Sequence, residues 1–130
     1  MKLRDKMAKV LHVTVGESVG QAGVRAARTM KALDEGRPVQ PWFGASFSEI
    51  GQMLAVFTPR RWELIAALRE AGPTTVADLA RRLQRHYKNV HSDVNLLIEW
   101  MAVERGADGK VGVPWSEIMV DMKLPERIAA

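Results

Sequence analysis

One segment, residues 75–110, constrains the fold of this chain more than any other part of the sequence. Across residues 75–83, apolar side chains recur every three or four positions, which predicts a helix with one buried face. A second helix is predicted at about residues 86–102. Its apolar face carries Val90, Val94, Leu97, Ile98 and Met101. The pair Asp108-Gly109 then predicts a hairpin across residues 104–111, with a type I′ turn that needs positive φ at both central residues.

The opposite face of the second predicted helix opens with hydrogen-bond donors, a cation and an aromatic ring. These side chains are Arg85, Tyr87, Lys88, Asn89, His91 and Ser92. Such groups suit phosphates and base edges. The turn between the two helices is also crowded with positive charge from Arg81, Arg82, Arg85 and Lys88, and a net charge of +4 favours a polyanionic partner. The alternative for each single residue is a solvated surface side chain.

Composition bounds the class of protein. At 130 residues, with 47% hydrophobic and 26% charged residues, the chain fits one globular domain, or a small domain with an appendage. The absence of cysteine excludes disulfides, thiolate nucleophiles and cysteine-based zinc sites. No apolar run approaches the roughly 18 residues that span a bilayer. We therefore expect a cytoplasmic protein that does not bind membranes.

The N-terminal region, residues 1–57, has a predicted organisation of its own. Residues 11–15 alternate apolar and polar side chains, which indicates a strand, and as an isolated edge it invites pairing or swapping with another chain. A helix is predicted over residues 18–35, ended by Gly36-Arg37-Pro38, and a second strand over residues 41–45. The helix has an unusually small face that lets another backbone approach. That face carries Val19, Ala22, Gly23, Ala26, Ala27, Met30 and Leu33.

Capping signals place the next helices. Ser46 and Glu49 have capping-box spacing and predict a helix with four apolar residues inward: Phe47, Ile50, Leu54 and Phe57. Thr58-Pro59 opens a helix that runs to about residue 71 and buries Trp62, Ile65 and Leu68. Thr75 with Asp78 opens the following one. Its free N–H groups suit a phosphate, with ordinary capping as the equal alternative.

Two boundaries complete the expected organisation. The turn at Leu83-Gln84-Arg85 lacks glycine, so we expect an extended or bridge-region backbone there. After the hairpin, residues 113–121 are expected to extend a sheet, because Ile118, Val120 and Met122 alternate. The chain then divides into residues 1–57, residues 58–123 and a tail of residues 124–130.

Helix, turn, helix and ribbon form the order of a winged helix-turn-helix, and particular residues strengthen this interpretation. The segments Phe57-Thr58-Pro59-Arg60-Arg61, Val76-Ala77-Asp78-Leu79-Ala80, Tyr87-Lys88-Asn89-Val90-His91 and Val113-Pro114 resemble a MarR-like winged-helix family. Members of that family are described as DNA-binding proteins or transcriptional regulators of bacteria and archaea, and some resemble antitoxins of toxin–antitoxin pairs. The resemblance is best over residues 58–121. It implies a winged domain over those residues. Together with the strand, helix and strand predicted in residues 1–57, the expected fold is α+β and mostly helical.

The resemblance and the residue chemistry together give a candidate DNA-binding set. It comprises Thr75, Arg81, Arg85, His86, Tyr87, Lys88, Asn89, His91, Ser92, Arg105 and Lys110. Asn89 suits adenine, and Arg85 or Lys88 suits guanine or a phosphate. Arg105 and Lys110 flank the predicted ribbon and would reach the backbone or minor groove. His86 and His91 are five residues apart, whereas a helical zinc pair needs a spacing of four, so we expect no metal and no cofactor.

The expected function is sequence-specific DNA binding by a transcriptional regulator that represses its own operon. We expect a homodimer on a palindromic operator, because two half-sites multiply specificity. A role as the antitoxin of a pair, with a small toxin bound by residues 1–57, is compatible with this. The alternative is a winged-helix module used for protein assembly without DNA readout. We expect no catalysis, because the sequence has no nucleophile elbow, phosphate loop or paired carboxylates at a strand end.

Overall fold

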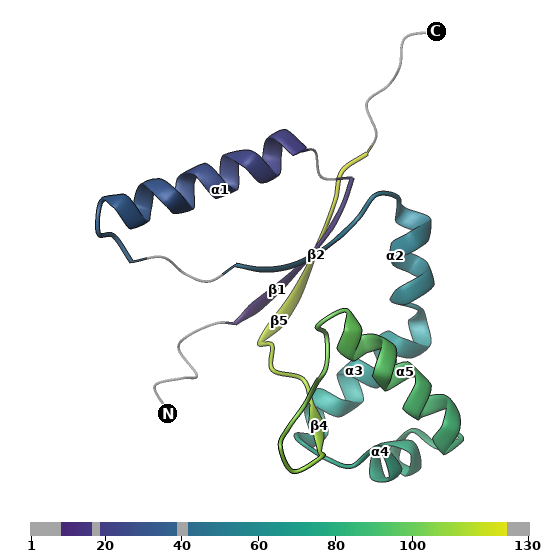
Figure 1. Ribbon diagram of the computed structural model, residues 1–130. Helices are drawn as coiled ribbons and strands as arrows, with labels where there is room; N and C mark the ends of the chain where they lie inside the picture. Colours follow the sequence, from purple (N-terminus) through teal and green to yellow (C-terminus); the bar gives the residue numbers. More distant parts are fainter. Residues whose placement is uncertain (1–8, 17–18, 39–41, 125–130) are drawn as a thin grey trace, which may run out of the picture.

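The computed structural model describes residues 9–16, 19–38 and 42–124 (Figure 1). The elements follow in the order β1 (Val10–Val15), α1 (Val19–Asp34), β2 (Phe43–Phe47), α2 (Ile50–Val56), α3 (Pro59–Ala71), α4 (Val76–Leu83), α5 (Tyr87–Glu99), β3 (Glu104–Arg105), β4 (Val111–Gly112) and β5 (Glu117–Met122). The predicted α+β class with a majority of helix is confirmed. No helix in this described part of the chain is long and apolar enough to cross a membrane.

The larger sheet has three parallel strands in the order β2-β1-β5. Val13 in β1 lies opposite Ala45 in β2 and Val120 in β5. Leu11, Val13 and Val15 point to one face of this sheet and are buried in the core. The expectation that residues 11–15 form an isolated edge was wrong, because β1 has a neighbour on each side. The outer strands are β2 and β5.

Helix α1 lies beside the other face of the sheet, across from α2 (Figure 1). The Arg25 guanidinium sits 3.8 Å from the centre of the Trp42 ring, and that ring stacks on His12 with centroids 5.2 Å apart. Trp42 lies flat over Gly44, where a Cβ would come within 2.1 Å of the ring. The side of α1 that bears Arg25 is therefore the side attached to the sheet.

The small face of α1 points away from the sheet, because Met30 lies five residues, or 140° of helix, beyond Arg25. Met30 and Leu33 on that face are 65% and 62% exposed. The predicted helix and strand are both confirmed here, within a residue or two. The expected first positions, Ser18 and Pro41, lie outside the described residues, as do most of the tail and residues 1–8.

Helix α2 begins later than the sequence analysis expected. Ser46 belongs to β2, and the capping box is formed by Glu49 with Gln52. Phe47 extends the strand because its ring stacks on Trp100, with centroids 4.4 Å apart. With this start, Met53 faces the core, and Ile50 and Leu54 are 42% and 52% exposed, so their predicted burial was wrong.

Helix α3 agrees with its capping signals. The Thr58 hydroxyl accepts a hydrogen bond from the Arg61 N–H, Pro59 is the first helical residue, and Gly72 ends the helix with φ 76°. Ile65 and Leu68 are buried as predicted, together with Leu64. Trp62 is half-buried and stacks on Phe57.

Helices α4 and α5 are joined by three residues, Gln84, Arg85 and His86, of which the first has a left-handed conformation. Gln84 has φ 54° and ψ 45°, so the expected extended or bridge-region geometry was wrong. A single left-handed residue at the end of a helix changes the direction of the chain, and glycine is the residue that most often occupies such a position. Helix α5 also ends three residues earlier than expected. Met101 lies beyond it with φ 68°, and its carbonyl accepts a hydrogen bond of 2.7 Å from the Trp115 indole.

The ribbon of β3 and β4 is antiparallel, and Thr74 pairs with Val111 beside it. The predicted type I′ turn was wrong, because Gly109 has positive φ and Asp108 does not. The loop is longer than two residues: Gly106 N–H donates to the Lys110 carbonyl, and Gly109 N–H donates to the Gly106 carbonyl. A longer loop needs only one left-handed residue, which Gly109 supplies. The expected last strand is present as β5, although it begins at Glu117 and not at residue 113, and it pairs with β1 of the three-stranded sheet and not with the ribbon.

Candidate nucleic-acid interface

The first two turns of α5 present a polar surface. Tyr87 is 51% exposed, and Lys88, Asn89 and Ser92 are exposed beside it. The opposite side of the helix is fixed by three fully buried residues, Val90, Val94 and Leu97. Since an apolar stripe holds the helix against α3 and α4, its polar residues have no alternative but to face outward.

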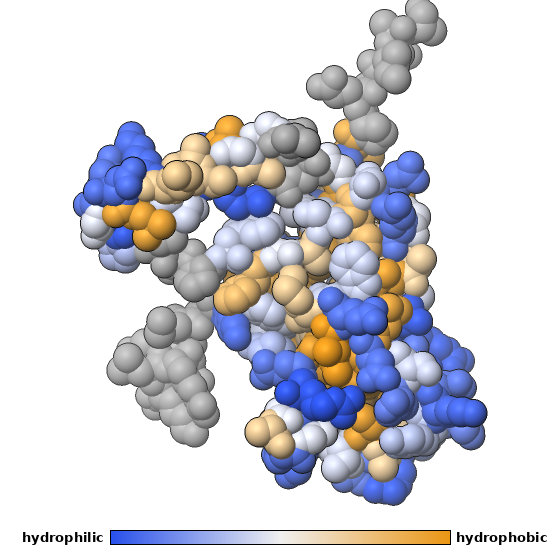
Figure 2. All heavy atoms as spheres, viewed as in Figure 1, coloured by the Kyte–Doolittle hydropathy of each residue, from blue (hydrophilic) through white to orange (hydrophobic). Residues whose placement is uncertain are grey.

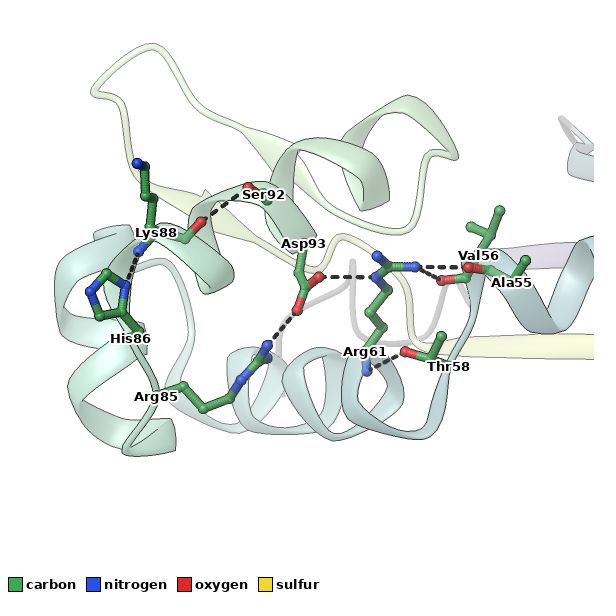
Figure 3. A network of polar contacts seen from close by, with 9 residues as sticks. All are labelled: Ala55, Val56, Thr58, Arg61, Arg85, His86, Lys88, Ser92 and Asp93. Atoms are coloured by element: carbon green, nitrogen blue, oxygen red, sulfur yellow. Dashed lines mark hydrogen bonds and ion pairs between the residues drawn. The ribbon is translucent and has the colours of Figure 1, made fainter.

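Local contacts order this surface (Figure 3). His86 caps α5, with its Nδ1 accepting a hydrogen bond of 3.2 Å from the Lys88 N–H. The Ser92 hydroxyl donates to the Lys88 carbonyl at 3.0 Å, and the Tyr87 ring stacks on His91. His86 therefore already has a structural task, whereas the Lys88 side chain is exposed and points away from this cap (Figure 3).

Arg85 was expected on the exposed polar face, but its side chain is largely buried. Its Nη2 lies 2.8 Å from one oxygen of Asp93, and Arg61 Nε lies 3.1 Å from the other (Figure 3). The side chains of Arg85, Arg61 and Asp93 are only 17%, 21% and 13% exposed. Because this guanidinium is held inside the fold, Arg85 is not part of the exposed polar surface.

The Asp93 cluster connects distant parts of the chain. Arg61 Nη1 also donates to the carbonyls of Ala55 and Val56, at the end of α2. Asp93 thereby joins the α2–α3 junction to the α4–α5 turn. The sequence held a signal for this: Asp93 falls among the buried positions of its helix, and a buried carboxylate needs a charged partner.

Thr75 caps α4 in the ordinary way, because its hydroxyl oxygen accepts a hydrogen bond of 3.1 Å from the Asp78 N–H. The Asp78 carboxylate binds Arg81. Hydrogen bonds from Arg81 and Thr75, and then the nearby charges of Arg81 and Lys110, hold the pKa of Asp78 below its usual range. Arg81 is thus partly neutralised, although its side chain remains 73% exposed.

Asn95 links α5 to the ribbon, and the sequence analysis missed it. Its side-chain oxygen accepts a hydrogen bond of 3.3 Å from Arg105 Nη2, and its amide nitrogen lies 3.4 Å from His91 Nδ1. Helical spacing could have identified Asn95, because it follows His91 by four residues and Ser92 by three. It extends the same exposed face by one turn.

Nine of the eleven predicted residues lie in two groups, and the other two, Arg85 and His86, make contacts at the turn before α5. One continuous surface is formed by the start of α5 and the ribbon, with Tyr87, Lys88, Asn89, His91, Ser92, Asn95 and Arg105. A second group lies at the start of α4, where Lys110 of the ribbon is near Asp78, Thr75 and Arg81. These groups offer hydrogen-bond donors, cations and one aromatic ring. Within the described ranges, no cluster of three or more His, Asp or Glu side chains could hold a metal ion.

Comparison with known proteins adds one result. No curated protein and no solved structure matches the chain. A protein-family model matches residues 56–120, which run from the end of α2 into β5 and include the whole polar surface of α5. Because that match covers half of the 130 residues, the chain belongs to the HVO_A0114 family.

Proposed function

We propose that this protein is a sequence-specific DNA-binding transcriptional regulator of the winged helix-turn-helix type. In this proposal α4 and α5 are the helix-turn-helix, and the β3–β4 ribbon is the wing. The exposed start of α5, with Tyr87, Lys88 and Asn89 projecting from a helix whose other side is buried, carries the proposal. In helix-turn-helix proteins, the N-terminal residues of the second helix meet base edges in the major groove.

The proposal gives the exposed residues separate tasks. Asn89 suits the N6 and N7 atoms of adenine, and Lys88 suits a phosphate or the O6 and N7 atoms of guanine. Arg105 and Lys110 would follow the DNA backbone beside the ribbon. Arg85 acts indirectly, because its bond to Asp93 fixes the turn that precedes α5.

Binding to the DNA upstream of the protein's own reading frame tests the proposal. Fluorescence anisotropy with that duplex and with a shuffled duplex of equal length, each at two salt concentrations, separates specific from general binding. An autorepressor should prefer the upstream duplex, with an affinity that falls as salt rises, because phosphate contacts release counterions. Equal, weak binding to both duplexes would instead favour a protein-assembly role.

Matched variants separate base reading from phosphate binding. Asn89→Ala should cost about 1–3 kcal/mol on the preferred duplex and little on the shuffled one. Lys88→Ala should weaken binding to both and reduce the salt slope by about one. Lys31→Ala removes the same charge from the exposed side of α1 and should change neither affinity. Equal losses for Asn89→Ala on both duplexes would contradict base reading.

A second candidate role, as the antitoxin of a toxin–antitoxin pair, is favoured by the outward face of α1. Its exposed Met30 and Leu33 are large apolar side chains that a partner protein would cover. The test is co-expression with a small protein encoded beside this chain. A complex that Leu33→Lys weakens, with DNA binding unchanged, would support this role. A complex insensitive to Leu33→Lys would assign the toxin to another surface.

A further inference from the structure

Strand β5 forms an open and apolar edge of the three-stranded sheet. Its inner side pairs with β1, and among the described residues no strand pairs with its outer side. Met119, Val120 and Met122 are 48%, 43% and 45% exposed, on both faces of the strand. In Figure 2 apolar surface follows the line that the sheet takes in Figure 1, between α1 and α2. An exposed edge strand of this kind is a template for another chain.

We propose that β5 pairs antiparallel with β5 of a second copy, which forms a homodimer around one continuous six-stranded sheet. A two-fold axis perpendicular to the sheet makes the two edge strands antiparallel and self-complementary. The same strand supplies both sides of the interface, so no other segment of the chain is required. Pairing satisfies the open backbone edge and covers apolar side chains of both copies.

Charge selects the register of this pairing. In an antiparallel pair, residues that lie opposite each other have their side chains on the same face of the sheet. Two copies related by the two-fold axis therefore pair with one residue opposite its own copy. The two strands overlap over the greatest length when that residue is Met119 or Val120. With Val120 on the axis, Glu117 lies opposite the partner's Lys123, and Ile118 lies opposite the partner's Met122. With Met119 on the axis, Glu117 meets the partner's Asp121, and like charges oppose each other. The register centred on Val120 is therefore favoured.

The geometry of the pairing has a consequence for the helical units. The sheet packs its Leu11–Val13–Val15 face on the core shared with α3, α4 and α5. A perpendicular two-fold axis keeps the two packed faces on one side of the joined sheet. Both α3–α5 units then extend from that side, as binding to two half-sites would require. The dimer itself does not rest on the proposed DNA-binding function, because it forms without DNA.

Sedimentation velocity of the full chain over a range of concentrations, without DNA, is the first test. We expect a shift from the monomer mass to twice that mass. Val120→Lys places two ammonium groups opposite each other and should raise the dimer dissociation constant at least about tenfold. Met30→Lys makes the same change on the exposed face of α1 and should leave the constant unchanged. Circular dichroism shows whether each variant keeps its helix content.

Charge reversal tests the register with substitutions at exposed positions. Glu117→Lys and Lys123→Glu should each weaken the dimer, and the double variant should restore it, because the opposed charges are exchanged. A tighter dimer with Glu117→Lys would place Met119 on the axis and overturn the proposed register. The interface is overturned if the protein stays monomeric at every concentration, or if Met30→Lys dissociates the dimer and Val120→Lys does not. DNA affinity, measured separately, reports on the proposed function and not on this interface.

Discussion

Two helices of this chain, α1 and α4, have amphipathic sequences but opposite surroundings. Helix α4 has eight residues, and Val76, Leu79 and Ala80 on its apolar face are buried against neighbouring helices. Helix α1 has sixteen residues, yet residues 20–34 are all exposed or half-buried. An amphipathic pattern thus identifies the apolar face of a helix but not what covers it.

The same contrast holds for ion pairs. Among helices α3, α4 and α5, Asp93 binds both Arg61 and Arg85, and all three side chains are largely buried. In the N-terminal region, Glu35 and Arg37 form a 2.7 Å pair with side chains about half exposed, at 46% and 57%. The two ion pairs of Asp93 join separate elements, whereas the Glu35–Arg37 pair joins neighbours in sequence at the end of α1. We expect these pairs to differ widely in their contribution to stability.

The largest expected effect comes from Asp93→Ala. It leaves two guanidinium groups without a carboxylate in a largely buried site, so we expect a loss of about 3–5 kcal/mol in the free energy of unfolding. Glu35→Ala removes an exposed pair and should change that free energy by less than about 1 kcal/mol. Urea denaturation of both variants measures the difference. Equal losses would show that the Asp93 cluster is well solvated.

A smaller effect is expected from truncation of one leucine in each helix. Leu79 in α4 is fully buried, and Leu79→Ala should reduce the free energy of unfolding by about 3 kcal/mol, through lost burial and a residual cavity. Leu33 in α1 is 62% exposed, and Leu33→Ala should change it by about 0.5 kcal/mol or less. Chemical denaturation at two protein concentrations is the measurement. A large loss for Leu33→Ala would mean that the outer face of α1 is covered in solution.

Local signals account for what the sequence could predict. Thr58-Pro59, Thr75 and Gly72 mark helix ends through contacts within four residues, so α3 and α4 were placed almost to the residue. The exposed face at the start of α5 followed from helical periodicity in the same way. These features depend on neighbours in the chain, which a sequence displays directly.

Contacts between distant residues account for what was missed. Arg61 and Asp93 are 32 positions apart, and nothing local indicates that Asp93 also binds Arg85. The pairing of β5 with β1 joins the two ends of the described chain, so the sheet that contains β5 could not be assigned. The shift of α2 arose likewise, from the stacking of Phe47 on the distant Trp100.

The residues that follow α1 and α4 provide a sharper comparison, because here a substitution is expected to raise the stability of the protein. Gly36 follows α1 with φ 70°, whereas Gln84 follows α4 with φ 54°. A left-handed conformation costs a residue with a Cβ roughly 1–2 kcal/mol, and glycine avoids this cost. Glycine also loses more backbone entropy on folding, which offsets about half of that gain. Gln84→Gly should therefore raise the free energy of unfolding by about 0.5–1 kcal/mol. Thermal unfolding measures it, with Gly36→Ala as the reverse substitution, which should lower stability.

The smallest expected effect concerns the exposed ion pair at the start of α4. Hydrogen bonds from Arg81 and Thr75 lower the pKa of Asp78 from its usual 3.8, so the folded state favours the carboxylate. A lowered pKa stabilises the fold fully above pH 3.8, and this contribution is lost as the pH falls through the folded-state pKa. The advantage of the natural chain over Asp78→Asn should thus be constant above about pH 5 and shrink in more acidic solution. Denaturation from pH 2.5 to 6 measures the difference, with Glu35→Gln as the matched change in the N-terminal region. A difference that stays constant down to the lowest pH would mean that Asp78 stabilises α4 through its shape or capping contacts, and not through its charge.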